Sequence, residues 1–313
     1  MDQRLIAADG QARGPSVPGV DVLLRAFSMV RYRFFLYAGL LPYLLGAAWA
    51  LQLDHHVDAE TFWTGLLGIA LAVVGVEAFN EFFDSRMGTD RVFDARDLPP
   101  MSVLVFWLGV AGFAGAAAIG VYLAFQAGWP VLVFAAVGGL AAAFYVGPPI
   151  RWAYRGLGEL MIGLSYGPWM TLGSLYLLAH RLSRDAVLAS FVPGLLIMSL
   201  AVANNIPDFH QDRLVGKRNL VVRLGRRFGV FLYLALASAA LVVLAVGAGE
   251  GVFPPASFAG LLAAPLLVSS AGVAIRAYET PRPFVRAIQS VVLAYLIAVT
   301  LFTLAIVLTE WIG

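Results

Sequence analysis

The stretch FWTGLLGIALAVVGVEAFNEFFD, residues 62–84, indicates what kind of protein this chain is. It holds no charged residue before Glu77, and about 20 mostly apolar residues are enough for a helix to cross the hydrocarbon core of a membrane. The stretch then ends in polar residues at spacings of three and four, which share one helical face: Glu77, Asn80, Glu81 and Asp84. It therefore predicts a membrane span whose inner end carries a polar face.

Apolar blocks of the same kind fill most of the chain. Apolar residues make up 60% of the 313 positions and charged residues 13%, against about half and about a quarter in a soluble domain. With 62–84, the blocks are 29–52, 101–126, 129–146, 157–179, 187–209, 228–248, 254–275 and 286–309. We expect an all-α, polytopic membrane bundle of about nine transmembrane helices, enclosing a central cavity that opens to the cytoplasmic face and to lipid.

The positions of the basic residues predict the orientation. If the N-terminus and every second loop lie on one side, that side holds all of the 21 Lys and Arg residues except Arg181 and Arg184. Cytoplasmic loops carry such an excess, so we place the N-terminus in the cytoplasm. Residues 1–28 are predicted to be a cytoplasmic tail without a cleavable signal sequence, and 29–313 a single transmembrane domain.

Composition also excludes some classes of function. The chain has no cysteine, which rules out disulfide and thiolate chemistry. Its net charge is only +2, with no basic face to neutralise nucleic-acid phosphates, so we expect no nucleic-acid partner. The expected surroundings are a lipid bilayer, and no protein partner can be inferred.

A second polar cluster resembles the first. The stretch Asn204-Asn-Ile-Pro-Asp208-Phe-His-Gln-Asp212 again has an Asn four residues before an Asp, at the end of an expected span. Asn204, Asp208 and Asp212 would share one helical face, with Pro207 opening the end of the helix because it lacks a backbone N–H. The displacement of four spans between the clusters suggests two similar helical halves.

Both clusters fit a magnesium site. Carboxylates near hydrocarbon depth are expensive unless they face a wet cavity or an ion. Oxygen ligands without Cys suit a hard cation, and Mg²⁺ is usually held by carboxylates together with substrate phosphates. Two Mg²⁺ ions and a diphosphate between the clusters would account for these acids, with Arg86, Arg151 and Lys217 close by. The alternative is that the acids lie in solvated loops and pair with neighbouring arginines.

Aromatic residues gather toward the inner ends of the expected spans, among them Tyr145. Aromatic faces can stabilise a carbocation by cation–π attraction. Rings at this depth also form ordinary membrane-interface belts, so the pattern alone leaves both interpretations open.

Together these motifs resemble the UbiA superfamily of intramembrane prenyltransferases. The resemblance runs from about residue 29 to the end, and its spacing is most similar to the menaquinone-pathway branch, whose members prenylate 1,4-dihydroxy-2-naphthoate. Arg31-Tyr32-Arg33 resembles the family's Arg-Pro-Arg stretch, although Tyr32 and Glu81 depart from its usual pattern. Besides the two Asn/Asp clusters, it rests on Tyr145 with Pro148-Pro149, on Tyr154-Arg155-Gly-Leu-Gly158-Glu159, and on Gly216-Lys217-Arg218 with Arg223-Leu-Gly225.

The resemblance implies a site and a reaction. The donor would be an isoprenyl diphosphate held by two Mg²⁺ ions, and the acceptor an electron-rich aromatic compound. The implied catalytic residues are Asn80, Asp84, Asp208 and Asp212, which with Asp90 are also the implied metal ligands. The implied substrate-binding residues are Arg33, Arg86, Tyr145, Arg151, Asn204 and Lys217.

Three alternatives remain open at this point. The same chemistry could act on 4-hydroxybenzoate or a non-quinone acceptor, or the enzyme could cyclise a terpene. A different class of protein, a cation- or proton-coupled transporter, also keeps Asp and Asn within membrane helices. Against a transporter, the acids concentrate at one membrane face and continue into a basic loop.

Overall fold

The computed structural model describes residues 39–87 and 101–312, and every regular element in them is a helix. The expected all-α class is therefore confirmed. The first half contains α3 (Leu41–Asp54), α4 (Ala59–Met87), α5 (Val103–Ala127), α6 (Pro130–Ala143), η3 (Trp152–Tyr154), α7 (Gly158–Leu164), η4 (Ser165–Trp169) and α8 (Met170–Ala179). The second half contains α9 (Arg184–Asn205), α10 (Phe209–Leu214), α11 (Leu220–Leu224), α12 (Arg226–Gly249), η5 (Pro255–Ala263), α13 (Ala264–Ala277) and α14 (Pro281–Ile312).

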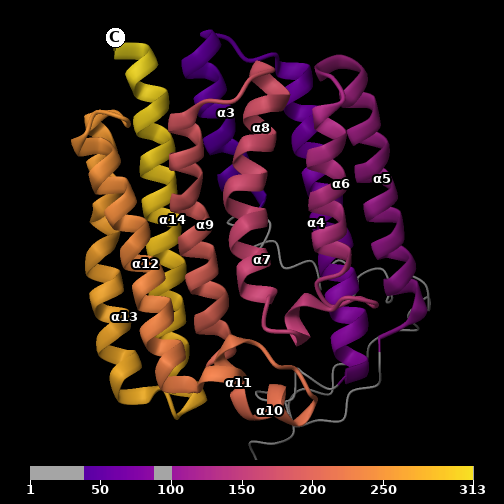
Figure 1. The fold of residues 1–313 in the computed structure, drawn as a ribbon, viewed down its shortest axis with the longest axis vertical. Coiled ribbons are helices and arrows are strands. Elements are labelled where there is room, and N and C mark those ends of the chain that lie inside the picture. The colour runs from indigo at the N-terminus through magenta and orange to yellow at the C-terminus, as the bar shows by residue number, and fades with distance from the viewer. Residues whose placement is uncertain (1–38, 88–100, 313) are drawn as a thin grey trace, which may run out of the picture.

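Six stretches of the described chain are long and apolar enough to cross a membrane: α4, α5, α9, α12, η5 with α13, and α14. In Figure 1 the long helices run side by side along one axis, as expected for a polytopic bundle. The total of nine spans, the cytoplasmic N-terminus and the division into a tail and one domain stay predictions. Two predicted site residues, Arg33 and Asp90, lie outside the described residues.

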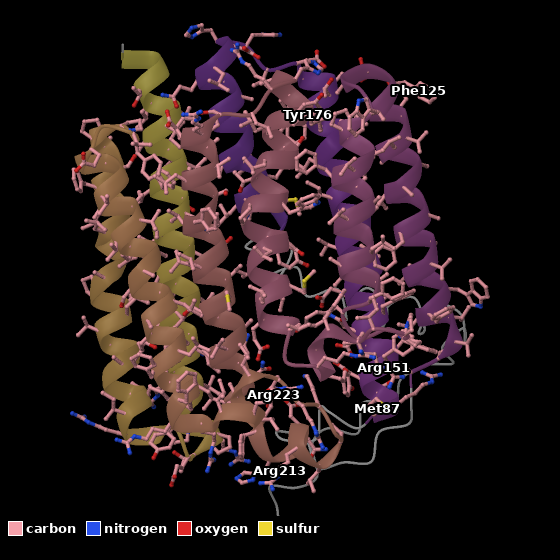
Figure 2. All side chains as sticks on the ribbon, in the orientation of Figure 1. Met87, Phe125, Arg151, Tyr176, Arg213 and Arg223 are labelled. Carbon is pink, nitrogen blue, oxygen red and sulfur yellow. The ribbon has the colours of Figure 1, made fainter. Side chains whose placement is uncertain are left out.

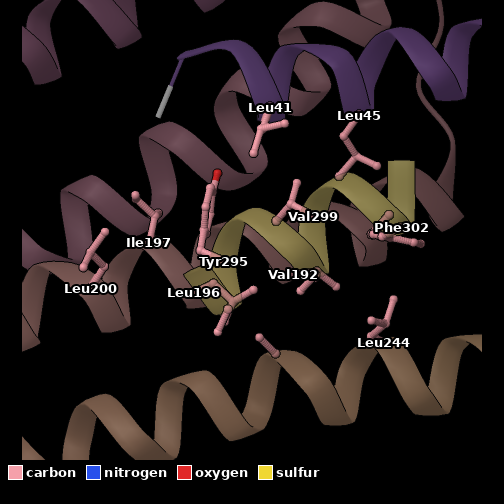
Figure 3. Packing of buried hydrophobic residues seen from close by; sticks show 14 of the residues in the cluster. Leu41, Leu45, Val192, Leu196, Ile197, Leu200, Leu244, Tyr295, Val299 and Phe302 are labelled. Atoms are coloured by element: carbon pink, nitrogen blue, oxygen red, sulfur yellow. The ribbon is translucent and has the colours of Figure 1, made fainter. Parts of the chain in front are cut away.

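The hydrophobic core lies where α9 and α14 cross α3 and α12. Leu196 and Ile197 of α9 belong to one cluster with Tyr295 and Phe302 of α14, all of them fully or almost fully buried. Figure 3 shows Leu196 and Ile197 beside Tyr295. Leu45 of α3 and Leu244 of α12 close the cluster from either side. This packing makes the α9 side of the bundle solid and leaves the space for a site on its other side.

Helices α7, η4 and α8 form one continuous helical stretch that stands between α9 and the pair α4 and α6 (Figure 1). Its middle turn, η4, has π-helical spacing and contains Pro168, whose missing N–H cannot make the α-helical hydrogen bond. Gly167 on this turn packs directly on Gly194 of α9. Small residues at such contacts let membrane helices approach closely.

We expect Gly167→Ala to loosen this contact, because a Cβ at position 167 would collide with the Cα of Gly194. Overpacking of this kind costs about 1–3 kcal/mol, measurable by denaturant unfolding of the purified protein in detergent. Gly272→Ala on α13 is the matched control, since a Cβ there would have no neighbour within 4 Å. Equal stability of the two variants would contradict the close-contact interpretation.

Candidate active site

A cavity of about 1090 Å³ lies between α4, α5 and α6 on one side and α7, η4, α8 and the end of α9 on the other. Along α4 its wall runs from Gly65 to Asp84, roughly 28 Å at 1.5 Å per residue. Most of this wall is apolar, and on α6 it is made largely of Ala and Gly. The large empty volume follows from those small side chains, which cannot fill the space between the helices.

The inner end of the cavity is polar, and α4 supplies its first group of residues. Glu77, Asn80 and Asp84 all line the cavity, as their spacing predicted, whereas Glu81 is not part of the lining. Glu77 is only 7% exposed. The Asn80 side-chain oxygen is buried and accepts no hydrogen bond from any described residue. The α4 face therefore presents an oxygen that is available to a ligand.

The second polar group comes from the end of α9 and the segment after it. Asn204 and Asn205 line the cavity, but α9 ends at Asn205 and a turn separates it from the short helix α10. The expectation that Asn204, Asp208 and Asp212 share one helical face is therefore wrong. Asp208 is the residue before α10 and Asp212 lies within it. Ile206 keeps a helical backbone, with φ −67° and ψ −49°, and α9 ends there because Pro207 has no N–H to continue the helical hydrogen bonds.

Asp212 is held in a buried network rather than exposed to the cavity. Its side chain is 1% exposed, and Asn219 donates a hydrogen bond of 2.6 Å to its Oδ2. Its Oδ1 lies 3.5 Å from the ammonium of Lys217. The backbone supports this arrangement, because the Lys217 N–H donates to the Asp212 carbonyl at 2.8 Å.

Lys217 joins the two clusters, as it lines the cavity and is the cationic partner of Asp212. Burial acts to lower the pKa of Lys217, but the negative charges of Asp212, Asp84 and Asp208 outweigh it, so the pKa is raised above its usual value. The ammonium therefore stays charged at neutral pH. Asp84 from the first cluster and Asp208 and Asp212 from the second all act on this one side chain, so the structure brings the clusters together.

The remaining predicted residues are placed differently from one another. Tyr145 lines the cavity, as expected for a residue near the reacting groups. Arg151 is not part of the cavity lining. Its guanidinium lies 5.8 Å from the centre of the Tyr154 ring, and its backbone takes a left-handed conformation with φ 55°. Arg86 is exposed and turns back on its own helix, where it donates to the Phe82 carbonyl and lies 3.5 Å from the centre of its ring. Arg86 is thus not part of the cavity lining.

Tyr154 belongs to the Tyr154-Arg155-Gly-Leu-Gly158-Glu159 motif, but the motif alone indicates no role for it. Its hydroxyl is buried and has no hydrogen-bond partner among residues 39–87 and 101–312. Burial and the charge of Asp84 raise the pKa of Tyr154 to about 12, against the opposing effect of Lys217 and Arg151. The hydroxyl therefore keeps its proton and is available as a donor beside the two clusters.

These residues fit a magnesium diphosphate better than a metal ion alone. In the part of the chain that the structure describes, no three His, Cys, Asp or Glu side chains gather closely enough to hold a metal by themselves. Mg²⁺ usually keeps several waters and takes one or two carboxylates plus substrate phosphates. The free Asn80 oxygen and the nearby Asp84 suit such an open site, and Lys217 suits the phosphates.

Residues 39–291 match the sequence pattern of the UbiA prenyltransferase family. The match covers well over half of the chain and both polar clusters. The chain belongs to this family. Membership confirms the expected resemblance and the expected enzyme class, and with the six apolar helices it makes the chain an integral, multi-pass membrane protein.

Several curated relatives in the family are named for naphthoate prenylation. The chain is 31% identical to a 1,4-dihydroxy-2-naphthoate octaprenyltransferase of Mycobacterium tuberculosis, over 69% of this chain and 76% of that one. It is 26% identical to the enzyme of the same name from Bacillus subtilis, over 67% of this chain and 69% of that one. A 2-carboxy-1,4-naphthoquinone phytyltransferase of Synechocystis is also 26% identical, over 60% of this chain and 62% of that one. These relatives confirm the expected resemblance to the menaquinone-pathway branch.

Solved structures of family members share the fold. A digeranylgeranylglyceryl phosphate synthase superposes with a TM-score of 0.63 at 12% identity, covering 92% of this chain and 99% of that one. A UbiA homologue from Archaeoglobus fulgidus, bound to GPP and Mg²⁺, gives a TM-score of 0.60 at 14% identity. The superposition covers 90% of this chain and 99% of that one. At these identities the likeness is one of fold.

Proposed function

We propose that this protein transfers a prenyl group from an isoprenyl diphosphate to an aromatic acceptor of the dihydroxynaphthoate type. The observation that carries the proposal is the division of one cavity into two parts. Its inner end gathers Asp84, Asn204 and Lys217, and the rest is a long apolar space. A molecule with an anionic head and a long apolar tail matches both parts.

The polar end is the proposed diphosphate site. Asn80, Asp84, Asp208 and Asp212 would hold or orient two Mg²⁺ ions there, with Asp90 as a further ligand. Mg²⁺, when bound, neutralises the charge that develops on the leaving diphosphate. The fold neighbour solved with GPP and Mg²⁺ supports the use of a divalent metal. The inner, cytoplasmic face is the proposed side on which this end lies.

The chain's own residues would position and protect the reacting groups. Lys217 and Arg151 hold the diphosphate, and Asn204 orients it from the end of α9. The allylic C–O bond breaks, and its electron pair leaves with the diphosphate. A ring carbon of the acceptor then forms the new bond to the allylic carbon, and the ring becomes aromatic again when that carbon loses its proton, or its carboxylate as CO₂. Tyr145 would lie beside the developing positive charge. The apolar walls exclude water, which would otherwise quench that charge.

The acceptor assignment rests on the relatives named for naphthoate prenylation. A dihydroxylated ring is electron-rich enough to capture an allylic cation, and Arg33 or Arg151 could hold its carboxylate by a charge-assisted hydrogen bond. The same chemistry serves 4-hydroxybenzoate, so the two acids are the informative comparison.

One assay tests the proposal. Purified protein is incubated with allylic diphosphates of several lengths and equal concentrations of 1,4-dihydroxy-2-naphthoate and 4-hydroxybenzoate, with Mg²⁺ or with EDTA, and products are identified by mass spectrometry. We expect a prenylated naphthoate only with Mg²⁺, because the described acids and amides form an all-oxygen site. Faster prenylation of the benzoate would remove the naphthoate assignment alone. Full turnover in EDTA would remove the metal model.

A further inference from the structure

Glu159 is a buried carboxylate that the proposed chemistry does not use. It lies in the first turn of α7 and is 1% exposed. Negative charge is favoured at this end of a helix by the free backbone N–H groups. Its Oε1 accepts two hydrogen bonds of 2.9 Å, one from the Asn205 side-chain amide and one from the Leu220 backbone N–H. Its Oε2 has no partner among the residues that the structure describes.

The first of these hydrogen bonds determines how Asn205 faces the cavity. An ionised carboxylate can only accept, so the amide nitrogen of Asn205 must point at Glu159. Its carbonyl oxygen then points the other way, and Asn205 is part of the cavity lining beside Asn204. Without Glu159 the amide could turn over and present its two N–H groups to the site instead. An amide NH₂ group cannot coordinate Mg²⁺, which takes oxygen ligands. It also cannot accept the hydrogen bond that a water bound to Mg²⁺ would donate.

The second hydrogen bond holds the segment that carries Asp212. Leu220 begins α11, and the residue before it, Asn219, caps that helix by accepting from the Val222 N–H at 2.8 Å. The same Asn219 donates to Asp212. Glu159 therefore ties the end of α9 to the start of α11, and so sets both Asn205 and, through Asn219, Asp212.

We propose that Glu159 is a positioning residue of the donor site, which fixes the Asn205 amide with its oxygen toward the cavity and anchors the segment behind Asp212. This inference rests on the proposed function, because it assumes that the polar end holds a magnesium diphosphate. Outer groups that orient the ligands of a metal site typically change metal affinity 10- to 100-fold when removed.

The probe is inorganic pyrophosphate with Mg²⁺, measured by calorimetry on the full-length protein in detergent. Glu159→Ala is expected to weaken Mg²⁺-dependent binding about 10- to 100-fold, and Asn205→Ala by a similar factor. Because Glu159 acts partly through Asn205, the double variant should lose much less than the product of the two losses. Ser199→Ala is the matched control, since it removes a buried hydrogen bond on α9, from Ser199 to the Tyr233 carbonyl, away from the cavity.

A reciprocal exchange tests the inference without the alanine variant. Asn205→Asp places two carboxylates against each other and should weaken binding strongly. Adding Glu159→Gln supplies an amide that can donate to the new carboxylate and still accept from Leu220, so N205D/E159Q should recover binding at least tenfold over N205D.

The outcomes separate this inference from the proposed function. Wild-type protein that binds no pyrophosphate with Mg²⁺ would overturn both. A Glu159→Ala variant that binds pyrophosphate with Mg²⁺ as tightly as the wild type, while its stability falls as in Ser199→Ala, would show that Glu159 is merely structural. That result would overturn this inference alone. So would an N205D/E159Q variant that binds no better than N205D.

Discussion

Asp84→Asn and Asp208→Asn should each lower the rate of diphosphate release about 100- to 1000-fold. This is the size of effect seen when one group that stabilises developing charge is removed from an active site. The two residues come from the two clusters that meet at Lys217, so each loss removes a charge that the metal-bound donor requires. Asn has almost the same shape as Asp, and both variants should remain folded in the membrane. The measurement is pyrophosphate release from a radiolabelled allylic diphosphate, with protein folding checked by thermal unfolding.

Asp185→Asn is the control for this pair, because Asp185 is an exposed acid at the opposite end of α9. It should release diphosphate at the wild-type rate. If instead Asp84→Asn and Asp208→Asn release diphosphate normally but abolish ion flux in liposomes, the protein is a transporter and the prenyltransferase proposal is wrong.

The second large effect concerns the buried ion pair. Lys217→Met should destabilise the protein by about 3–5 kcal/mol, because it leaves the carboxylate of Asp212 buried without its cation. The Asp212 side chain is 1% exposed and that of Lys217 14%. The same change removes the cation proposed to hold the diphosphate, so prenyl transfer should be lost as well. Denaturant unfolding and the transfer assay measure the two effects separately.

A second substitution separates stability from function at this pair. Lys217→Met combined with Asp212→Asn removes both charges, so stability should return toward wild type while transfer stays absent. Arg181→Met breaks the ion pair of Arg181 with Asp54 near the opposite end of the bundle, where the Arg181 side chain is 55% exposed. Exposed pairs contribute at most about 1 kcal/mol. A Lys217→Met variant as stable as Arg181→Met would contradict the buried-pair argument.

The side chains labelled in Figure 2 agree with the division that the basic residues predicted along the chain. Arg151, Arg213 and Arg223 are labelled at the same end of the bundle as Met87, whereas Phe125 and Tyr176 are labelled at the other end. The polar end of the cavity, with Asp84 only three residues before Met87, lies toward this basic end. A substrate with an anionic head would thus meet positive charge on its way into the site.

The sequence by itself determined the membrane bundle and the first cluster. Long apolar blocks can satisfy their backbone hydrogen bonds within lipid only as helices, so hydropathy alone predicts the fold class. The spacing of Glu77, Asn80 and Asp84 places them on one face of α4 wherever that helix packs, because the helical period sets their direction. These are local properties, and no contact with another helix is needed to derive them.

Only the tertiary structure decided the second cluster and its support. The chain could end α9 before Pro207 or bend through it, and the choice depends on how the 206–220 segment packs under α7. Glu159 lies 46 residues from Asn205 and 61 from Leu220, so no periodicity along the chain relates them. Arg86 could have pointed into the cavity, yet its guanidinium lies on Phe82. Which polar groups meet is set by long-range packing, and hydropathy and spacing carry no information about that.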